Sequence, residues 1–425
     1  LLRESGMPYD ANCKKVVINF DLGDLSSDAQ ITAASMSLYA KGYDNKETDL
    51  FMIVNPNAYV VPKWSTHILN LYSYQGATAD ELVWENPAGS DAEFLYILSR
   101  LAFIPYMAQE YALTKDEYYA QNAIKMMLDY VYETSDKRIL ATNGDSATLG
   151  GYPRSLDTAS RITSTITALE IFIHSDTMIV DYYVELMKNL WQMANFLTGS
   201  DPGQYHPANN WGIIEASGYA LAAQVFPEFA DSDTWKELSK NRANYMLENT
   251  FMLADGSYSE DASAYTNTTL GSLVQLRECY PDSTGLGEEF EKHLDELLEY
   301  YTNLTAANGE DIRWGDSDTS AVFNDKVRYF SPTSRVGRGA SLTGNQQVIS
   351  PFLDTNGKQM GVPFDYTSIH YWAKQVSILR SGWNPYDLYM FIDNTGNFSS
   401  HRHPDDLSVI VSAYGRVLLT DQGRY

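Results

Sequence analysis

The chain has 425 residues, 44% of them hydrophobic, and a formal net charge of −25 from 55 acidic and 30 basic residues. This length allows two or three domains, and the acidic balance argues against nucleic-acid binding, which requires a basic surface. The two cysteines, Cys13 and Cys279, are too few for a disulfide scaffold, and no apolar run is long enough to span a membrane.

The first 88 residues contain short stretches that alternate apolar and polar positions, as β-strands do. Residues 16–21 and 35–39 show this alternation, and turn-forming residues separate them. The stretch KVVINFDLGDLSSDAQITAASMSLYA resembles part of the β-sandwich modules that accompany polysaccharide-degrading enzymes. We therefore predict a β-rich segment over residues 1–88, which could belong to a carbohydrate-binding β-sandwich.

Residues 89–310 follow a helical pattern, with apolar side chains at steps of three and four. Successive helices joined by short connections favour antiparallel pairs, and we predict an incomplete (α/α) toroid. The expected helices cover about residues 92–112, 115–134, 158–174, 179–197, 211–226, 234–247, 268–279 and 288–303.

Residues 311–425 return to strand-like alternation. Strands are expected at 375–379, 388–393, 407–413 and 417–420, with turn sequences between them. We predict the start of an antiparallel β-sandwich, and we expect more β-structure to follow Tyr425 because so short a sheet is marginal. The predicted fold class is multidomain α+β, with the β-rich segment, the toroid and the sandwich in that order.

The histidines of HRHPDDLSVIVSAYGRVLLTDQG lie at alternate positions, so His401 and His403 can point to one face of an extended chain. One strand out and one strand back could bring Asp421 beside His403. Imidazole and carboxylate together form half of a metal site. A hydrogen-bonded His–Asp pair that stiffens a sheet explains the same spacing, and the residues leave both readings open.

A second polar group lies in the helical region. Asn209 and Asn210 precede a helix, where amides commonly serve as caps. The later segment ADGSYSEDASAY is expected to be a loop that presents acids and tyrosines, among them Tyr258, Glu260 and Tyr265. The tyrosines could equally be packing residues.

Three segments, NNW…GYALAAQVFPEF, DGSYSEDASAY and HRHPDDLSVIVSAYGRVLLTDQG, resemble motifs of the heparinase II/III-like polysaccharide lyases, in that family's order. GEDIRWGDSDTS and VSILRSGW are similar to its domain junction and first β-strands, so the likeness spans about residues 90–425. The resemblance implies a toroid joined to a β-sandwich. It also implies cleavage of a uronic-acid polymer by β-elimination.

The resemblance assigns roles to the helical cluster. Asn210 would neutralise the substrate carboxylate with Asn209 in support, and Trp211 stands where some members have histidine. The pattern E-x-x-x-x-Y matches Glu260 and Tyr265, which makes Tyr265 the expected acid and base. Residues expected to bind substrate without a catalytic role are Asn209, Trp211, Tyr258 and Glu260.

In the β-region, the resemblance makes His401 a catalytic residue and places Arg380 near the substrate carboxylate. His403 and Asp421 would hold a structural divalent metal, zinc in relatives, with a third histidine ligand expected beyond Tyr425. No organic cofactor is expected.

Elimination requires a base for the proton on C5 of the uronate and donors that stabilise the enolate. Because the reference pKa of tyrosine is about 10, a nearby cation such as Arg380 would have to lower it. The low basic content favours alginate as substrate, with a heparin- or heparan-type glycosaminoglycan as the alternative. A glycoside hydrolase or a glycan-binding protein is a further alternative, and hydrolase carboxylates could come from Glu215, Glu260, Asp316 and Asp318. We expect a secreted, periplasmic or cell-surface bacterial protein.

Overall fold

Helices dominate the first two thirds of the described chain. The computed structural model describes residues 92–140, 154–199, 210–282, 285–317, 331–332, 334–354, 356–396, 401–404 and 406–423. The predicted β-rich segment over residues 1–88 lies outside these ranges. The helices are α2 (Ala92–Ser99), α3 (Ile104–Thr114), α4 (Glu117–Leu140), α5 (Ser155–Phe172), α6 (Val180–Gly199), α7 (Trp211–Val225), α8 (Ser232–Met246), α9 (Ser263–Glu278), α10 (Glu288–Leu304) and α11 (Arg335–Thr343).

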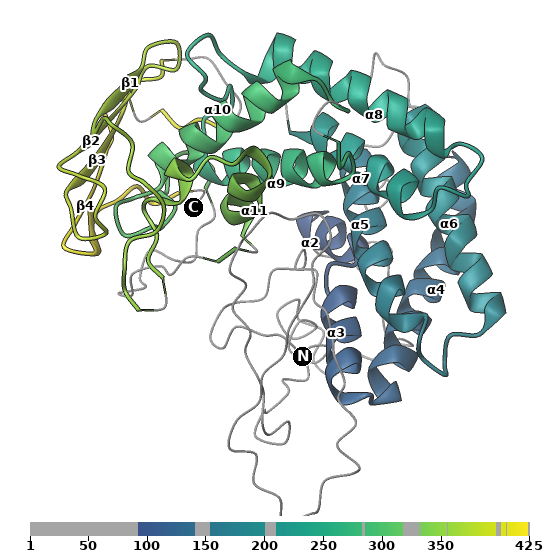
Figure 1. Ribbon diagram of the computed structural model, residues 1–425. Coiled ribbons are helices and arrows are strands. Elements are labelled where there is room, and N and C mark those ends of the chain that lie inside the picture. The colour runs from purple at the N-terminus through teal and green to yellow at the C-terminus, as the bar shows by residue number, and fades with distance from the viewer. Residues whose placement is uncertain are drawn as a thin grey trace, which may run out of the picture.

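The helices form an open arc of two layers (Figure 1). Helices α4, α6, α8 and α10 lie on the convex side, while α3, α5, α7 and α9 lie on the concave side. Each helix contacts its neighbours along the arc, as α5 does α7 and α7 does α9. This is the predicted incomplete toroid. None of the helices in the described ranges has both the length and the apolar character of a membrane span.

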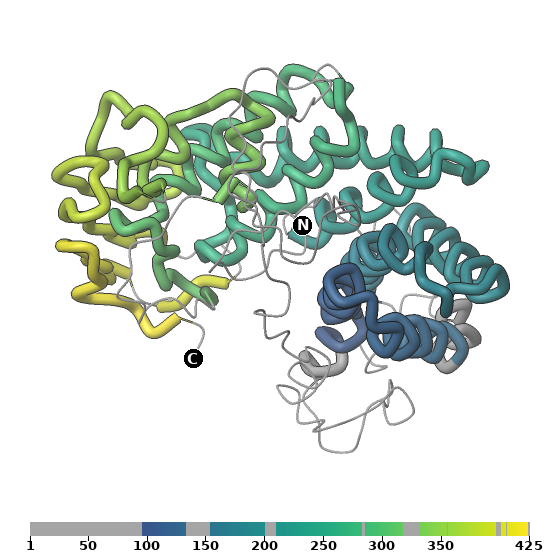
Figure 2. The backbone as a smooth tube through the Cα atoms, turned by 60° about the horizontal axis from the view of Figure 1, so that its bottom comes forward, coloured from purple at the N-terminus to yellow at the C-terminus, as the bar shows by residue number. Residues whose placement is uncertain are grey.

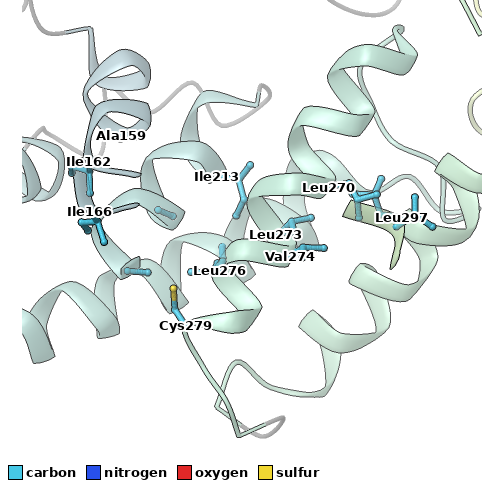
Figure 3. Close-up of a cluster of buried hydrophobic side chains, with 14 of the residues drawn as sticks. Ala159, Ile162, Ile166, Ile213, Leu270, Leu273, Val274, Leu276, Cys279 and Leu297 are labelled. Carbon is cyan, nitrogen blue, oxygen red and sulfur yellow. The ribbon is translucent and has the colours of Figure 1, made fainter. Parts of the chain in front are cut away.

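The core of the arc runs between the two layers. Figure 3 shows Ile162 and Ile166 of α5, Ile213 of α7 and Leu273 of α9 in one apolar cluster. Helices α5 and α7 approach closely because Gly218 has no side chain, and a Cβ there would lie 3.0 Å from Ala159 Cα. Burial of such side chains contributes about 1.5–3 kcal/mol each relative to exposure.

One predicted helix is broken in two. The pattern over residues 92–112 divides into α2 and α3, and Leu101 between them has a φ of 53°. Pro105 lies in the first turn of α3. Proline has no N–H to continue an α-helix and disfavours helical geometry before it, so the helix starts anew there.

A five-stranded antiparallel sheet in the order β1-β2-β3-β4-β5 closes one end of the arc. Its strands are β1 (Ile369–Tyr371), β2 (Val376–Arg380), β3 (Tyr389–Asp393), β4 (Val409–Ala413) and β5 (Arg416–Leu419). Figure 2 shows this sheet beside α10, at the opposite end of the molecule from α3 and α4. The four predicted strands are confirmed to within a few residues, and β1 was not predicted.

The helical part extends past the predicted boundary at residue 310. Helix α11 and a 3-10 helix (Gln347–Ile349) follow, and α11 packs on α9 and α10. The first strand begins only at Ile369. A helix of nine residues that packs against earlier helices gave too weak a periodic signal to be recognised.

Candidate active site

Asn210 lies at the start of α7 and is held by a carboxylate from another segment. Its Nδ2 donates to Glu260 Oε2 at 3.1 Å, and its backbone N–H donates to Glu260 Oε1 at 2.9 Å. In the described chain, the Asn210 side chain makes no capping hydrogen bond to α7. The amide is therefore oriented by Glu260, and the helix-cap reading is wrong.

Glu260 is 1% exposed and both of its carboxylate oxygens accept hydrogen bonds from Asn210, so the structure gives no support to the predicted direct contact with a polysaccharide. Burial raises the pKa of its carboxyl group, although the hydrogen bonds from Asn210 and the charge of His401 act in the opposite direction. Its two oxygens hold the backbone N–H and the side-chain amide of Asn210. The other proposed contact in this loop, Tyr258, is 0% exposed, and its hydroxyl lies 2.9 Å from Thr269 Oγ1. Tyr258 is a core residue.

Tyr265 and His401 come together from the two parts of the chain. Tyr265 lies in the first turn of α9, which begins at Ser263 where a loop was expected. Its ring stacks on the imidazole of His401 with centroids 3.6 Å apart and planes 15° from parallel. His401 has a φ of 69°, a conformation that side-chain-bearing residues rarely adopt and that is concentrated at functional sites.

Asp316 connects both histidines. Its Oδ2 lies 3.0 Å from His401 Nδ1, and its Oδ1 lies 2.9 Å from His403 Nε2. Burial acts to raise the pKa of Asp316, but the hydrogen bonds from the two histidines outweigh it, and the pKa is lowered. Fixing Nδ1 of an imidazole leaves Nε2 as the nitrogen that can face a ligand.

Close backbone packing brings Asp316 to this position. Gly315 has a φ of 57°, and a Cβ there would overlap the carbonyl oxygens of Asp261 and His401. Asp316 N–H donates to His401 O at 3.0 Å. Three segments far apart in the sequence therefore meet at one glycine.

The predicted metal ligands are engaged with other groups. His403 contacts Asp316, while Asp421 Oδ1 accepts from Gly423 N–H at 2.6 Å. Within the described ranges, no three His, Cys, Asp or Glu side chains are placed to hold an ion. These residues offer imidazole and carboxylate donors but no assembled ligand set, and the metal site stays a prediction.

Arg380 does not serve the site as predicted. It is 6% exposed, and its Nη2 donates to the carbonyl oxygens of Asn303 at 3.2 Å and Thr305 at 2.5 Å. Burial lowers the pKa of Arg380 to about 10, which leaves it charged at neutral pH. A cation at a helix C-terminus satisfies unpaired carbonyls and complements the helix dipole. Arg380 therefore joins β2 to the end of α10 and is not available to a substrate carboxylate.

Trp211 is half-buried, and the guanidinium of Arg154 lies 5.0 Å from the centre of its indole. Asn209, the last of the predicted substrate-binding residues, lies outside the described residues.

A buried lysine joins the sheet to the loop that carries Glu260. Lys374 is 4% exposed, its ammonium pairs with Asp261, and it donates to Ser259 O at 2.8 Å. Burial lowers the pKa of Lys374, while Asp261 favours its charged form. Sequence reasoning missed this contact because it links residues far apart in the chain. Asp316 was considered only as a hydrolase carboxylate, although its place in GEDIRWGDSDTS was a usable signal.

The comparisons with known proteins all indicate one family. The model of the heparinase II/III N-terminus matches residues 56–332. The chain is 20% identical over 360 residues to a heparin-sulfate lyase of Bacteroides stercoris, covering 81% of this chain and 52% of that protein. It is 23% identical over 360 residues to a heparin-sulfate lyase of Pedobacter heparinus, covering 81% and 50%. The chain thus spans about half the length of the curated relatives it matches.

Solved structures share the fold. A crystal structure of heparinase III aligns with a TM-score of 0.66 at 18% identity and covers 87% of this chain and 60% of that one. The heparan sulfate lyase HepC from Pedobacter heparinus aligns with a TM-score of 0.57 at 20% identity, covering 80% and 51%. These likenesses confirm the predicted fold class. Because the family model matches more than half of the residues, the chain belongs to the heparinase II/III family.

Proposed function

We propose that this protein is a polysaccharide lyase that cleaves a uronic-acid-containing polymer of the heparan type by β-elimination. The observation that carries the proposal is the pairing of Tyr265 with His401, next to an Asn210 that is fixed by Glu260. A phenol can act as base and acid in this reaction, and an imidazole and an amide can donate to the enolate. The heparin-sulfate lyases among the relatives support the choice of polymer, whereas alginate receives no support from them.

In the proposed reaction, Tyr265 acts as its phenolate; Arg380 is held at the end of α10 and does not contact it, and the group stacked on its ring is the imidazole of His401. The phenolate oxygen removes the proton from C5 of the uronate. The C5–H electron pair forms the C4=C5 double bond, and the C4–O bond breaks. The leaving oxygen then takes the proton back from Tyr265. One group can perform both transfers when the proton and the leaving oxygen lie on the same face of the ring.

Asn210 and His401 stabilise the enolate in this scheme. Asn210 is 3% exposed, and its Nδ2 lies 3.1 Å from Glu260 Oε2 and 3.4 Å from Oε1, so in this scheme the amide turns an N–H toward the substrate carboxylate when the substrate binds. His401 is fixed through Nδ1 by Asp316 and offers Nε2. A preorganised donor of this kind contributes about 3 kcal/mol to transition-state stabilisation.

The described carboxylates do not favour a hydrolase. Glu215 is 4% exposed and paired with Arg242 at 2.5 Å, Glu260 is bound to Asn210, and Asp316 is bound to two histidines. Hydrolases need two carboxyl groups that flank the scissile bond. Asp318 lies outside the described residues.

A panel of polymers tests the proposed function. The purified protein is incubated with heparan sulfate, heparin, hyaluronan, chondroitin sulfate and alginate, and the ultraviolet absorbance of the unsaturated uronate is recorded. We expect product from heparan-type polymers. New reducing ends without that absorbance would indicate a hydrolase and contradict the proposal, while binding without any product would favour a glycan-binding protein.

A further inference from the structure

The turn between β1 and β2 carries a buried lysine. This turn covers residues 372–375 and joins Tyr371 to Val376. Gln375 in this turn has a φ of 63°, a conformation that residues with a side chain seldom adopt unless surrounding contacts hold it. The side chain of its neighbour Lys374 is 4% exposed. Because burial of an ammonium is unfavourable without partners, the partners of Lys374 define what the turn is built to hold.

Those partners lie in the segment before α9, residues 252–262, which we call the entry loop. Asp255 Oδ2 accepts from two backbone N–H groups of the turn, at 2.6 and 3.4 Å. Further along the loop, the Lys374 ammonium pairs with Asp261 and donates to Ser259 O at 2.8 Å. The turn therefore holds the entry loop near both of its ends.

The entry loop leads to groups of the candidate active site. Glu260 lies next to Asp261 and accepts from both the backbone N–H and the amide of Asn210. Tyr265 lies in the first turn of α9, directly after the loop, and stacks on His401 from the segment between β3 and β4. The position of the loop relative to the sheet therefore sets both the direction of the amide and the stacking of the two rings.

Lys374 also lies among three buried acids. Asp261 and Glu260 are each 1% exposed, and Asp393 is 0% exposed. Burial lowers the pKa of Lys374, while the charges of these acids act in the opposite direction. Trp314 completes the group, because its Nε1 donates to Asp393 at 2.8 Å and its ring centre lies 5.5 Å from the ammonium. Since a charge interaction is mutual, the ammonium favours the ionised form of Glu260.

We propose that Lys374 is a positioning residue, which acts through the entry loop to align Asn210 and Tyr265 of the helical arc with His401 of the β-region. Its own side chain is buried and does not contact the substrate. The inference rests on the proposed function and deepens it, because it names the contact that assembles one site from two parts of the chain. Such alignment matters because a displacement of about 1 Å can lower a rate about a hundredfold.

Lys374→Met tests this role in the full chain, because methionine keeps an unbranched side chain and removes the ammonium. With heparan sulfate, we expect kcat per folded molecule to fall about ten- to a hundredfold with KM little changed, because the displaced groups act in the transition state. Arg277→Met is the matched control. Arg277 is also buried, at 5% exposure, but it pairs with Glu291 and lies at the far end of α9. Wild-type kcat in Lys374→Met, or an equal loss in the control, would overturn the proposal.

The pH profile provides a readout that a purely structural contact would not change. Glu260 is faced by Asn210 of α7, by His401 and Lys374 from the β-region, and by Tyr258 of its own loop. Loss of the ammonium removes a charge that favours the carboxylate, so the acid limb of kcat/KM should move to higher pH. The control should keep the wild-type limb. A limb that stays in place or moves to lower pH in Lys374→Met counts against the proposal.

Asp255→Ala decides the question if Lys374→Met does not fold. It removes the acceptor of the two N–H groups of the turn and leaves no buried cation without its partner. We expect a loss in kcat of about tenfold, the effect of one hydrogen bond to a charged group. Wild-type kcat in this variant would then refute the positioning role.

Failure of the proposed function is recognised separately, because the wild-type protein then releases no unsaturated product from any polymer. Hydrogen exchange of backbone amides tests the positioning without activity. Lys374→Met should exchange faster than wild type over residues 252–262 and at Asn210, whose N–H is bound to Glu260, and Arg277→Met should not. Wild-type exchange rates at both places in Lys374→Met would show that the lysine does not hold the loop.

Discussion

The contact between Glu260 and Asn210 gives the sharpest prediction. Replacing Glu260 by Gln keeps one acceptor oxygen but turns an amide donor toward the donors of Asn210, so one of the two bonds at 2.9 and 3.1 Å is lost. A hydrogen bond to a charged group contributes about 1.5–3 kcal/mol, which corresponds to a loss in kcat of roughly ten- to a hundredfold if Asn210 acts in the transition state. Initial rates of ultraviolet absorbance on heparan sulfate measure this loss.

Glu215→Gln is the matched control, because Glu215 is also buried and lies on α7 but pairs with Arg242. It removes the carboxylate that pairs with the buried Arg242 guanidinium, which costs about 3–5 kcal/mol of unfolding free energy, while kcat per folded molecule stays near wild type. Calorimetric melting separates the two effects. Wild-type kcat in Glu260→Gln, or losses of activity in both variants that simply follow their melting temperatures, would refute the positioning role.

The same carboxyl group predicts a pH dependence. Its pKa is raised in the folded state, chiefly by burial, so the folded protein holds this proton more tightly than the unfolded chain does. The contribution of Glu260 to unfolding free energy therefore falls as pH rises from about 4.3, its unfolded pKa, through the folded pKa. Activity needs the ionised form, so kcat/KM should rise over the same interval in the wild type. Glu260→Gln should lack both changes, and an unchanged acid limb in this variant would contradict the assignment.

Three further predictions concern the rest of the site. Tyr265→Phe should lower kcat by several orders of magnitude with an unchanged melting temperature, and retention of a tenth of the activity would remove Tyr265 from the mechanism. Gly315→Ala should lower the free energy of unfolding by about 2–5 kcal/mol, through left-handed strain and overlap with Asp261 and His401; a melting temperature equal to wild type would show that the junction can relax. If His403 and Asp421 hold zinc, elemental analysis of the purified protein should find one ion per chain and chelation should lower the melting temperature; protein without stoichiometric metal would exclude the site.

The sequence by itself determined the helical arc, four strands and the family. Local periodicity specifies these elements because each buried helix face repeats every three or four residues and each strand alternates. Asn210, Tyr265 and His401 were also recognisable, because they lie in short motifs of fixed spacing. Glu260 was found for the same reason, although its role as the partner of Asn210 was not.

Only the tertiary structure decided which side chains meet. The side chains of Arg380 and Tyr258 are of types that can bind a sugar substrate. In the structure, however, Arg380 is buried against the end of α10 and Tyr258 lies in the core. Asp316 became the partner of both histidines through a backbone approach at Gly315. Such contacts join segments far apart in the chain, so no local pattern encodes them. Their positions follow from how the sheet packs against the arc of helices.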